Sequence, residues 1–433
     1  MKSAVILAGG RGKRLGNLTK DIPKPLIEVG GKPVIVHQIL LLRRYGIKNI
    51  WILSGYLGNK INEFIGNGAK WGVNIRYLVE KNPLGTAGAI KTLQGVIKDD
   101  FLVFSGDVIL DVDLNSFLKF HKKNAATVTI AVHPTDHPFD SDLVEVKKND
   151  QISKFHVRPH SKNLIFRNLS IASIFVLNSR IMNYIPSNLF TDLEKDILPK
   201  LLKSGERIFA YKTAEYIKDM GTPERMKMVD VDIRSGLVQK LNSKNKRKAI
   251  FLDRDGTINE DVPFLTRLEE MTLFPFTARA VKKINASEYL AIVITNQATI
   301  SMGKMDEDQL NNIHKKLESE LGKQGVKLDA IYYCPHYPES GYVGEIKELK
   351  IRCACRKPKI GMIKQAARDF NIDLSKSLYI GDTSVDLETA RNAGLKFIGV
   401  ETAGSKNERG LKKSNGIILE KNLLSAVNLI LGK

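Results

Sequence analysis

Residues 248–257 read KAIFLDRDGT, a short apolar run that ends in two carboxylates. The apolar residues predict a buried β-strand, and the aspartates mark its carboxyl end. Asp253 and Asp255 are two positions apart, so both would lie on the same side of the sheet edge where open α/β sheets bind ligands. Gly256 permits the sharp turn that follows. The stretch therefore predicts an α/β fold with a polar site at the end of this strand.

Similar apolar runs alternate with amphipathic stretches in both directions from this strand, and strands that alternate with helices predict parallel sheets. The stretch at 234–248, RSGLVQKLNSKNKRK, is polar and basic and directly precedes the strand. We therefore predict an N-terminal domain at 1–233, a linker at 234–247 and a C-terminal domain at 248–433. Examples of the other strand-like runs are AVILAGG (4–10), NIWILSGY (49–56), DFLVFSGDV (100–108), LAIVITNQ (290–297) and SLYIGDT (377–383).

The 433-residue chain has 43% hydrophobic and 26% charged residues and a formal net charge of +20. This charge raises nucleic-acid binding as a hypothesis, but the densest basic run, Lys244–Lys248, contains no aromatic residue and falls in the predicted linker. We expect no nucleic-acid partner, and phosphorylated substrates would explain part of the charge. No apolar run reaches the roughly 18 residues of a membrane helix. The start, MKSAVILAGG, lacks the apolar core of a signal peptide, so we expect a cytoplasmic protein without membrane contact.

Further polar elements follow Asp253 in the C-terminal part. Thr295-Asn296 ends a strand with a hydroxyl and an amide that can hold phosphate oxygens. Arg356-Lys357 offers two cations for a developing phosphoryl charge. Asp382 ends a third strand and supplies a hard carboxylate for Mg²⁺. One aspartate of the Asp253/Asp255 pair can attack phosphorus while the other handles the leaving-group proton.

In this order, the motifs resemble the haloacid dehalogenase (HAD) superfamily of phosphatases over residues 248–430. The resemblance implies a doubly wound parallel sheet, an aspartyl-phosphate formed on Asp253, and Asp255 as general acid/base. It also implies that Lys357 neutralises the phosphoryl group, and that Mg²⁺ is held by Asp253, Asp382 and the Asp255 backbone carbonyl. We expect the substrate to be bound by Asn259, Thr295, Asn296, Gln297, Arg356 and Lys357.

All three cysteines of the chain lie close together, with one histidine among them. Cys334 and His336 are followed by a loop and then by Cys353 and Cys355. Three thiolates and one imidazole are the donors of a closed, tetrahedral, structural zinc site. The alternative is a set of buried cysteines beside a surface histidine. The loop leads directly into Arg356-Lys357, so a bound zinc would fix both cations.

The zinc loop narrows the resemblance to the D-glycero-D-manno-heptose 1,7-bisphosphate phosphatases, with the histidinol-phosphate phosphatases as a sister family. The quoted motifs are FLDRDGTIN, TNQ, CPHYP, CACRKPKIGM and GDTSVD. The sequence departs from the heptose pattern at two places. Ala298-Thr299 follows Gln297 where the family has Ser-Gly, and Thr383 follows Asp382 where a lysine is common.

A glycine-rich loop follows the first strand of the N-terminal part, AGGRGKRL at 8–15. Glycines let backbone N–H groups approach the phosphates of a nucleotide. The spacing fits neither the dinucleotide-binding GxGxxG motif nor the P-loop. Downstream, prolines hold Lys24 toward the loop, and Asp107 and Asp219 are candidate Mg²⁺ ligands. Taken singly, each aspartate is more often a cap or a turn residue.

The motifs LAGGxGxRL, PKPL, GTAG, SGD and DMGTP resemble the sugar-1-phosphate nucleotidyltransferases of GT-A-like, Rossmann-like fold over residues 1–232. The resemblance implies that a sugar phosphate attacks the α-phosphorus of a nucleoside triphosphate. Arg14 and Lys24 would bind phosphates, and Asp107 and Asp219 would hold Mg²⁺. Lys195 is a candidate for the sugar phosphate, with a solvated helix lysine as the alternative. We expect the nucleotide to contact Leu7, Ala8, Gly9, Gly10, Gly12, Arg14, Lys24, Gly85 and Thr86.

The two resemblances together favour one pathway. A heptose phosphatase produces heptose 1-phosphate, which a guanylyltransferase would convert with GTP into GDP-heptose, whereas a histidinol phosphatase needs no nucleotidyltransferase. The expected partners are therefore sugar phosphates and GTP, with Mg²⁺ in both domains and structural Zn²⁺ in the second. The same two chemistries on another sugar, such as mannose, and one non-catalytic sugar-nucleotide-binding domain are the alternatives. The sequence leaves the nucleotide base, the anomer and the oligomeric state open.

Overall fold

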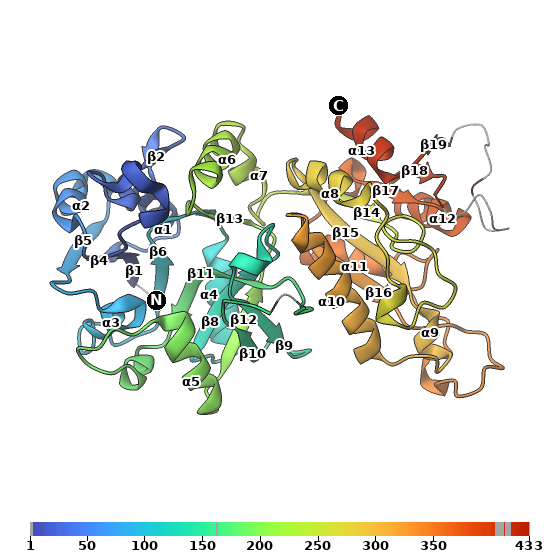
Figure 1. Ribbon diagram of the computed structural model, residues 1–433, viewed down its shortest axis with the longest axis horizontal. Helices are drawn as coiled ribbons and strands as arrows, with labels where there is room; N and C mark the ends of the chain where they lie inside the picture. The colour runs from blue at the N-terminus through green and yellow to red at the C-terminus, as the bar shows by residue number, and fades with distance from the viewer. Residues whose placement is uncertain (1–2, 162, 403–410, 412–416, 433) are drawn as a thin grey trace. The chain divides into compact units, whose positions relative to one another are not determined.

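The structure is a computed structural model that describes residues 3–161, 163–402, 411 and 417–432. The chain folds into two compact α/β units (Figure 1), so the predicted two-domain architecture is confirmed. Unit 1 comprises Met1–His133, Ser141–Arg158 and Leu169–Asn242, and unit 2 comprises Pro134–Asp140, Pro159–Asn168 and Ser243–Lys433.

A nine-stranded sheet forms the centre of unit 1. Its parallel middle has the order β6-β1-β4-β5, and β11 pairs with β6 in the antiparallel sense. The strands of this sheet are β1 (Ser3–Ala8), β4 (Asn49–Ser54), β5 (Asn74–Val79), β6 (Phe101–Ser105), β8 (Val128–His133), β9 (Leu143–Val146), β10 (Ile152–His156), β11 (Ser170–Leu177) and β12 (Ile208–Lys212). Two small sheets pair β2 (Glu28–Val29) with β3 (Lys32–Pro33) and β7 (Val108–Asp111) with β13 (Tyr216–Asp219).

Helices cover both faces of this sheet. Side chains on β1 alternate between two cores: Ile6 packs in the core that contains Ile39 of α1, and Val5 packs in the core that contains Ile90 of α3. The helices of unit 1 are α1 (Val34–Arg44), α2 (Gly58–Ile65), α3 (Gly85–Lys91), α4 (Leu114–Lys123), α5 (Leu198–Lys203), α6 (Pro223–Arg234) and α7 (Leu237–Lys240), together with short turns at Lys13–Thr19, Lys24–Leu26, Ala69–Trp71, Ser179–Tyr184 and Leu193–Ile197.

The stretch expected to be a linker contains regular structure. Helix α7 lies within it, and Val238 of α7 is buried in the same small core as Leu15 and Val229. The contact boundary between the units falls at Asn242 and Ser243. The predicted linker limits at 233 and 248 remain predictions. They rest on the polar composition of this stretch, and composition does not show that one valine within it is buried.

Unit 2 is built on a six-stranded, all-parallel sheet with the order β16-β15-β14-β17-β18-β19. Consecutive residues Ala249–Leu252 of the central strand are buried, as expected when helices cover both faces. The strands are β14 (Lys248–Leu252), β15 (Tyr289–Asn296), β16 (Ala330–Cys334), β17 (Leu378–Gly381), β18 (Lys396–Val400) and β19 (Ile418–Glu420). The helices are α8 (Thr277–Asn285), α9 (Ala298–Ser301), α10 (Glu307–Lys323), α11 (Gly361–Asp369), α12 (Ser384–Ala393) and α13 (Leu423–Leu431), with short turns at Pro138–Asp140, Leu268–Glu270, Lys347–Leu349 and Leu374–Lys376.

Within unit 2, the segment Pro159–Asn168 packs on helix α10. The backbone N–H of Phe166 donates to Ser319 Oγ at 3.0 Å, and Arg167 Nε donates to Glu318 Oε2 at 2.6 Å. Nothing in the sequence pattern predicts this pairing, because the partners are about 150 residues apart. Among the described residues, no helix is both long enough and apolar enough to span a membrane.

Candidate active sites

Parallel pairing brings three strand ends of unit 2 to one sheet edge. Asp253 follows β14, Thr295 lies near the end of β15, and Asp382 follows β17. Because parallel strands end on the same side, their terminal side chains converge. Asp253 and Asp382 are both buried. The predicted cluster of polar residues is therefore present as one site.

Lys357 forms two ion pairs within this cluster. Its Nζ lies 2.8 Å from Asp253 Oδ1 and 2.7 Å from Asp386 Oδ1. The Tyr379 hydroxyl also donates to Asp386 Oδ1, at 3.1 Å, and Thr383 Oγ1 donates to its other oxygen at 2.6 Å. Asp386 therefore anchors Lys357, and Lys357 places its positive charge against Asp253.

Burial and the neighbouring charges shift the pKa values of the three aspartates in different directions. Burial and the negative charge of Asp386 raise the pKa of Asp253 well above its ordinary value, and the same two causes raise the pKa of Asp382 to about 7. Burial acts against ionisation of Asp386 too, yet the Lys357 ammonium and the Thr383 hydrogen bonds hold the pKa of Asp386 below its ordinary value. Lys357 pairs with both Asp253 and Asp386, so this one ammonium neutralises only part of the negative charge that the three aspartates carry when ionised.

This imbalance fits a divalent cation. Oxygens of Asp253, Asp382 and Asp386 all lie within 4.8 Å of one another. Three carboxylates beside one ammonium leave a formal excess of two negative charges, and carboxylate oxygens are preferred by Mg²⁺. The geometric group contains Asp386 in addition to the predicted Asp253 and Asp382.

Gly256 makes the close approach of the two strand ends possible. Its φ is +80°, and a Cβ atom at this position would lie 2.3 Å from Asp382 Oδ2. Any other residue would therefore push Asp382 away from Asp253 as well as strain the backbone. Thr257 Oγ1 then donates to Asp382 Oδ1 at 3.2 Å, which fixes that carboxylate.

Asp255 is held by three neighbours. Arg254 donates through Nε to Oδ1 at 3.0 Å and through Nη2 to Oδ2 at 2.8 Å. Asn259 Nδ2 donates to Oδ1 at 2.9 Å, and Gln297 Nε2 donates to Oδ2 at 3.1 Å. Burial acts in the other direction, but Arg254 and these amides keep the pKa of Asp255 below its ordinary value. Two residues predicted to bind substrate, Asn259 and Gln297, thus contact Asp255 directly.

The other predicted substrate residues have defined partners. Asn296 accepts from the Lys357 backbone N–H at 3.0 Å and donates to the Lys357 carbonyl at 3.2 Å, so its amide holds the lysine loop. Thr295 Oγ1 accepts from Gln297 Nε2 at 2.8 Å. Arg356 stacks on Tyr337, with its guanidinium carbon 4.7 Å from the ring centroid, and donates to the His336 carbonyl at 3.2 Å.

The predicted zinc ligands converge. The sulfur and Nδ1 atoms of Cys334, His336, Cys353 and Cys355 form a group within 4.8 Å. The measured separations between pairs of these atoms run from 3.2 to 3.6 Å. A tetrahedral zinc with ordinary Zn–S and Zn–N bonds would place its ligand atoms about 3.5–3.8 Å apart. The donor set and its spacing therefore fit a closed zinc site.

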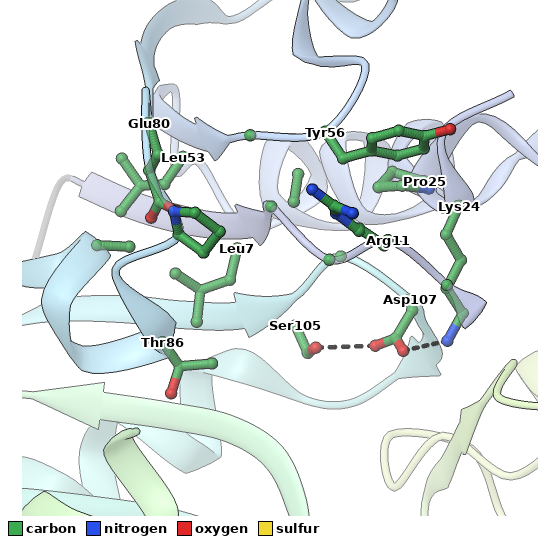
Figure 2. Close-up of a pocket in the computed structure, with 18 of the residues that line it drawn as sticks. Leu7, Arg11, Lys24, Pro25, Leu53, Tyr56, Glu80, Thr86, Ser105 and Asp107 are labelled. Atoms are coloured by element: carbon green, nitrogen blue, oxygen red, sulfur yellow. Dashed lines mark hydrogen bonds and ion pairs between the residues drawn. The ribbon is translucent and has the colours of Figure 1, made fainter. Parts of the chain in front are cut away.

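In unit 1, one pocket of about 740 Å³ opens at the carboxyl end of β1 (Figure 2). All nine residues predicted to contact the nucleotide line it, from Leu7 to Thr86. Lys24 forms an ion pair with Asp107, whose other oxygen accepts from Ser105 Oγ at 2.8 Å; Figure 2 shows this row. The glycine loop and the lysine predicted from sequence therefore face one space.

Asp219 lies beside Asp107 through backbone pairing. It faces Val108 across the β7–β13 ladder, and the Met220 N–H donates to the Asp107 carbonyl at 2.9 Å. Its carboxylate accepts from Arg225 Nη1 at 3.0 and 2.9 Å. Each of the two predicted magnesium ligands thus has a cationic partner within the protein.

Further lining residues were not anticipated from the sequence. Tyr56 and Arg11 stack at 5.8 Å, and Glu80 reaches the pocket from the end of β5 (Figure 2). Burial raises the pKa of Glu80, and its Oε2 accepts from the Leu84 N–H at 3.3 Å. The available signal was an acidic residue a few positions before the GTAG motif at 85–88. Lys195, the candidate for the sugar phosphate, is exposed on the turn Leu193–Ile197.

The family model described as nucleotidyl transferase matches residues 3–235, and one described as HAD-hydrolase-like matches residues 354–420. The chain belongs to the nucleotidyl transferase family, and its C-terminal part is HAD-like, as predicted. Over 174 residues it is 38% identical to the D-glycero-beta-D-manno-heptose-1,7-bisphosphate 7-phosphatase of Haemophilus ducreyi, covering 40% of this chain and 93% of that protein. The C-terminal part therefore belongs to the family of that phosphatase.

Other similarities concern the N-terminal part. Over 236 residues the chain is 31% identical to a mannose-1-phosphate guanylyltransferase of Mycobacterium tuberculosis, which covers 54% of this chain. The chain spans 65% of the length of that relative. A crystal structure of HddC from Yersinia pseudotuberculosis aligns with 54% of this chain and 100% of its own, at 24% identity and a TM-score of 0.47.

Proposed function

We propose that the chain is a bifunctional enzyme of heptose activation. Unit 2 hydrolyses the C7 phosphate of D-glycero-D-manno-heptose 1,7-bisphosphate, and unit 1 transfers GMP from GTP to heptose 1-phosphate, releasing pyrophosphate. The proposal rests on the presence of two sites in one chain. The Asp253–Lys357 pair lies in the part related to a heptose-bisphosphate phosphatase, and the nucleotidyl transferase pocket lies in unit 1. Phosphorylated substrates of this kind also suit a cytoplasmic location.

The phosphatase reaction follows from the geometry of Asp253 and Asp255. An oxygen of Asp253 attacks phosphorus, the bond to the sugar oxygen breaks, and Asp255 gives a proton to that oxygen. The pKa of Asp255 is low in the free protein, and the negative charge of the bound phosphate would raise it so that the carboxyl group can carry this proton. Water then attacks phosphorus, loses a proton to Asp255 and frees Asp253 and inorganic phosphate. Lys357, 2.8 Å from Asp253, neutralises the charge that accumulates on the phosphoryl oxygens.

Metal ions have distinct roles in the proposal. Asp253 and Asp382 would hold Mg²⁺, together with the backbone carbonyl of Asp255 predicted from the family. Asp386 completes the group of three carboxylates and anchors Lys357. When bound, Mg²⁺ supplies charge neutralisation for the phosphoryl group. The Cys₃His group would hold Zn²⁺ in a structural role, next to Arg356 and Lys357.

The transferase reaction needs positioning and charge neutralisation rather than a covalent intermediate. An oxygen of the sugar phosphate attacks the α-phosphorus of GTP, and pyrophosphate leaves. Arg14 and Lys24 line the pocket and would bind the phosphates, and Asp107 and Asp219 are the candidate Mg²⁺ ligands. Glu80 supports guanine as the base, because a carboxylate can accept both the N1–H and the N2–H₂ donors of guanine.

The test is a coupled assay. The full-length chain is incubated with Mg²⁺, either anomer of heptose 1,7-bisphosphate, and one of the four nucleoside triphosphates. Both anomers are required because the related phosphatases include enzymes named for each. We expect phosphate release and GDP-heptose with GTP. Phosphate release without any nucleotide sugar, or a nucleotide sugar formed only from another triphosphate, would contradict the proposal.

A second candidate retains the chemistry but changes the sugar to mannose. The two relatives of the N-terminal part named as mannose-1-phosphate guanylyltransferases favour it, at 31% and 34% identity. Competition between mannose 1-phosphate and heptose 1-phosphate for GTP separates the candidates. A higher kcat/KM for mannose 1-phosphate would replace the heptose assignment of unit 1.

A further inference from the structure

Arg254 stands between the two aspartates of the phosphatase site, and its guanidinium is buried. Its side chain is 1% exposed, and it is among the largest fully buried side chains of the described residues. A guanidinium carries five N–H donors and no acceptor, so burial requires fixed acceptors around it. Asp255 and His314 supply them: Arg254 donates twice to Asp255, at 3.0 and 2.8 Å, and its Nη1 lies 3.2 Å from His314 Nε2.

A tight turn makes this contact between sequence neighbours possible. The Ile258 N–H donates to the Arg254 carbonyl at 2.9 Å, and the Gly256 N–H donates to the Asn259 carbonyl at 2.8 Å. Adjacent side chains on a straight strand point to opposite faces, so Arg254 and Asp255 could not meet there. The turn at Gly256 directs the guanidinium back onto the carboxylate of the next residue.

His314 fixes the far end of the guanidinium. It comes from helix α10 and is buried. Because Arg254 offers only donors, His314 Nε2 is the acceptor, and the ring hydrogen lies on Nδ1. Burial, followed by the positive charges of Arg254 and Arg167, lowers the pKa of His314 well below its ordinary value, in agreement with a neutral ring.

Arg254 constrains Asp255 more than its other partners do. Asn259 and Gln297 each contribute one amide hydrogen bond, which allows the carboxylate to rotate about that contact. The two parallel N–H groups of Arg254 fix the plane of the carboxylate as well as its position. His314 in turn prevents rotation of the guanidinium.

We infer that Arg254, held in place by His314, is a positioning residue that sets the orientation of the Asp255 carboxyl for proton transfer to the leaving oxygen. This inference rests on the proposed phosphatase function. The step concerned is the one in which the Asp253–phosphorus bond forms, the phosphorus–oxygen ester bond breaks, and the proton of Asp255 passes to the departing sugar oxygen.

Two substrates with different leaving groups distinguish a loss of Asp255 positioning from a general loss of activity. A sugar alkoxide needs a proton to leave, whereas p-nitrophenolate is a stable anion that leaves without one. With enzyme in excess, the rate at which the sugar alcohol or p-nitrophenolate is released in a single turnover reports only the first step, because inorganic phosphate leaves in the second. In Arg254→Lys and His314→Leu, we expect the rate on the sugar phosphate to fall at least about 10-fold and the rate on p-nitrophenyl phosphate to change less than about 3-fold.

Two further variants complete the test. His314→Gln keeps an acceptor for Arg254 and should restore the wild-type ratio of the two rates. Glu318 lies on the same helix as His314 and pairs with Arg167, and Glu318→Gln should leave that ratio unchanged. Equal losses on both substrates, or no loss on the sugar phosphate, would overturn the inference while the phosphatase assignment stands. A wild-type protein that releases phosphate from no sugar phosphate would instead refute the proposed function, and the inference with it.

Discussion

Lys357 and Asp386 form a buried ion pair, with Nζ and Oδ1 2.7 Å apart. The pair holds the lysine from one side, and the same ammonium lies 2.8 Å from Asp253 on the other. A buried cation between two carboxylates keeps its charge: burial opposes it, but Asp253 and Asp386 raise the pKa of Lys357. The phosphatase site is therefore organised around a permanent positive charge.

Replacement of this charge should reduce turnover. In Lys357→Met, we expect kcat for phosphate release to fall on the order of 10²- to 10³-fold, because a fixed cation aimed at the phosphoryl group is lost. Lys359→Met is the matched control, since Lys359 is exposed on the same loop and donates to the Cys353 carbonyl. An equal fall in kcat in both variants would show that the conformation of the loop, and not the charge of Lys357, determines turnover.

Strand-end motifs could be predicted from the sequence because their chemistry is local. The aspartates of KAIFLDRDGT and the glycines of the first loop lie where parallel-strand geometry puts them. Asp386 was visible only as a residue that follows Asp382. Its contact with Lys357 joins positions 29 apart in the chain, and the sequence does not show that the loop with Lys357 meets the first turn of α12.

Glu80 offers a test of base recognition in unit 1. In Glu80→Gln, one carboxylate oxygen becomes an amide donor that would face the N–H groups of the proposed guanine. We expect kcat/KM for GTP to fall about 10- to 100-fold, corresponding to the loss of a bidentate contact, while values for ATP rise or stay level. Glu63→Gln, an exposed change on α2, is the control. A uniform loss for all four triphosphates would contradict base reading by Glu80.

Zinc removal should affect only one activity. The Cys₃His group leads into Arg356 and Lys357, so loss of the metal should displace both cations. We expect one zinc per chain by elemental analysis, and in Cys353→Ser a loss of zinc and of phosphate release with nucleotidyl transfer retained. Wild-type protein that is fully active and free of zinc would refute the site.

The contacts that individual side chains make could not, in contrast, be predicted from the sequence. Asn296, which is predicted to hold a phosphate oxygen, binds the backbone of Lys357, and Lys195 is exposed. A strand-end amide can serve either role, and a lysine in a polar helical stretch gives no sign of which way it points. The roles predicted for both residues remain proposals that substrate complexes would decide.

Glu194 gives unit 1 a pH-dependent stability. Burial, followed by the charges of Asp142 and Asp192, raises its pKa from an ordinary 4.5 to about 8. Its stabilising contribution is present below the unfolded pKa and is lost as the pH rises through the folded pKa. In Glu194→Gln, we expect the Tm to match the wild type near about pH 5 and to exceed it by several degrees near about pH 9. A Tm difference that does not vary with pH would contradict this.

We propose that two sites in one chain act in sequence on one sugar. Asp253→Asn separates the two steps, because it removes the nucleophile and leaves the pocket of unit 1 untouched. With GTP and Mg²⁺, we predict that this variant makes no GDP-heptose from heptose 1,7-bisphosphate but makes it at the wild-type rate from heptose 1-phosphate. GDP-heptose formation from the bisphosphate by the variant, or failure with both substrates, would contradict the account.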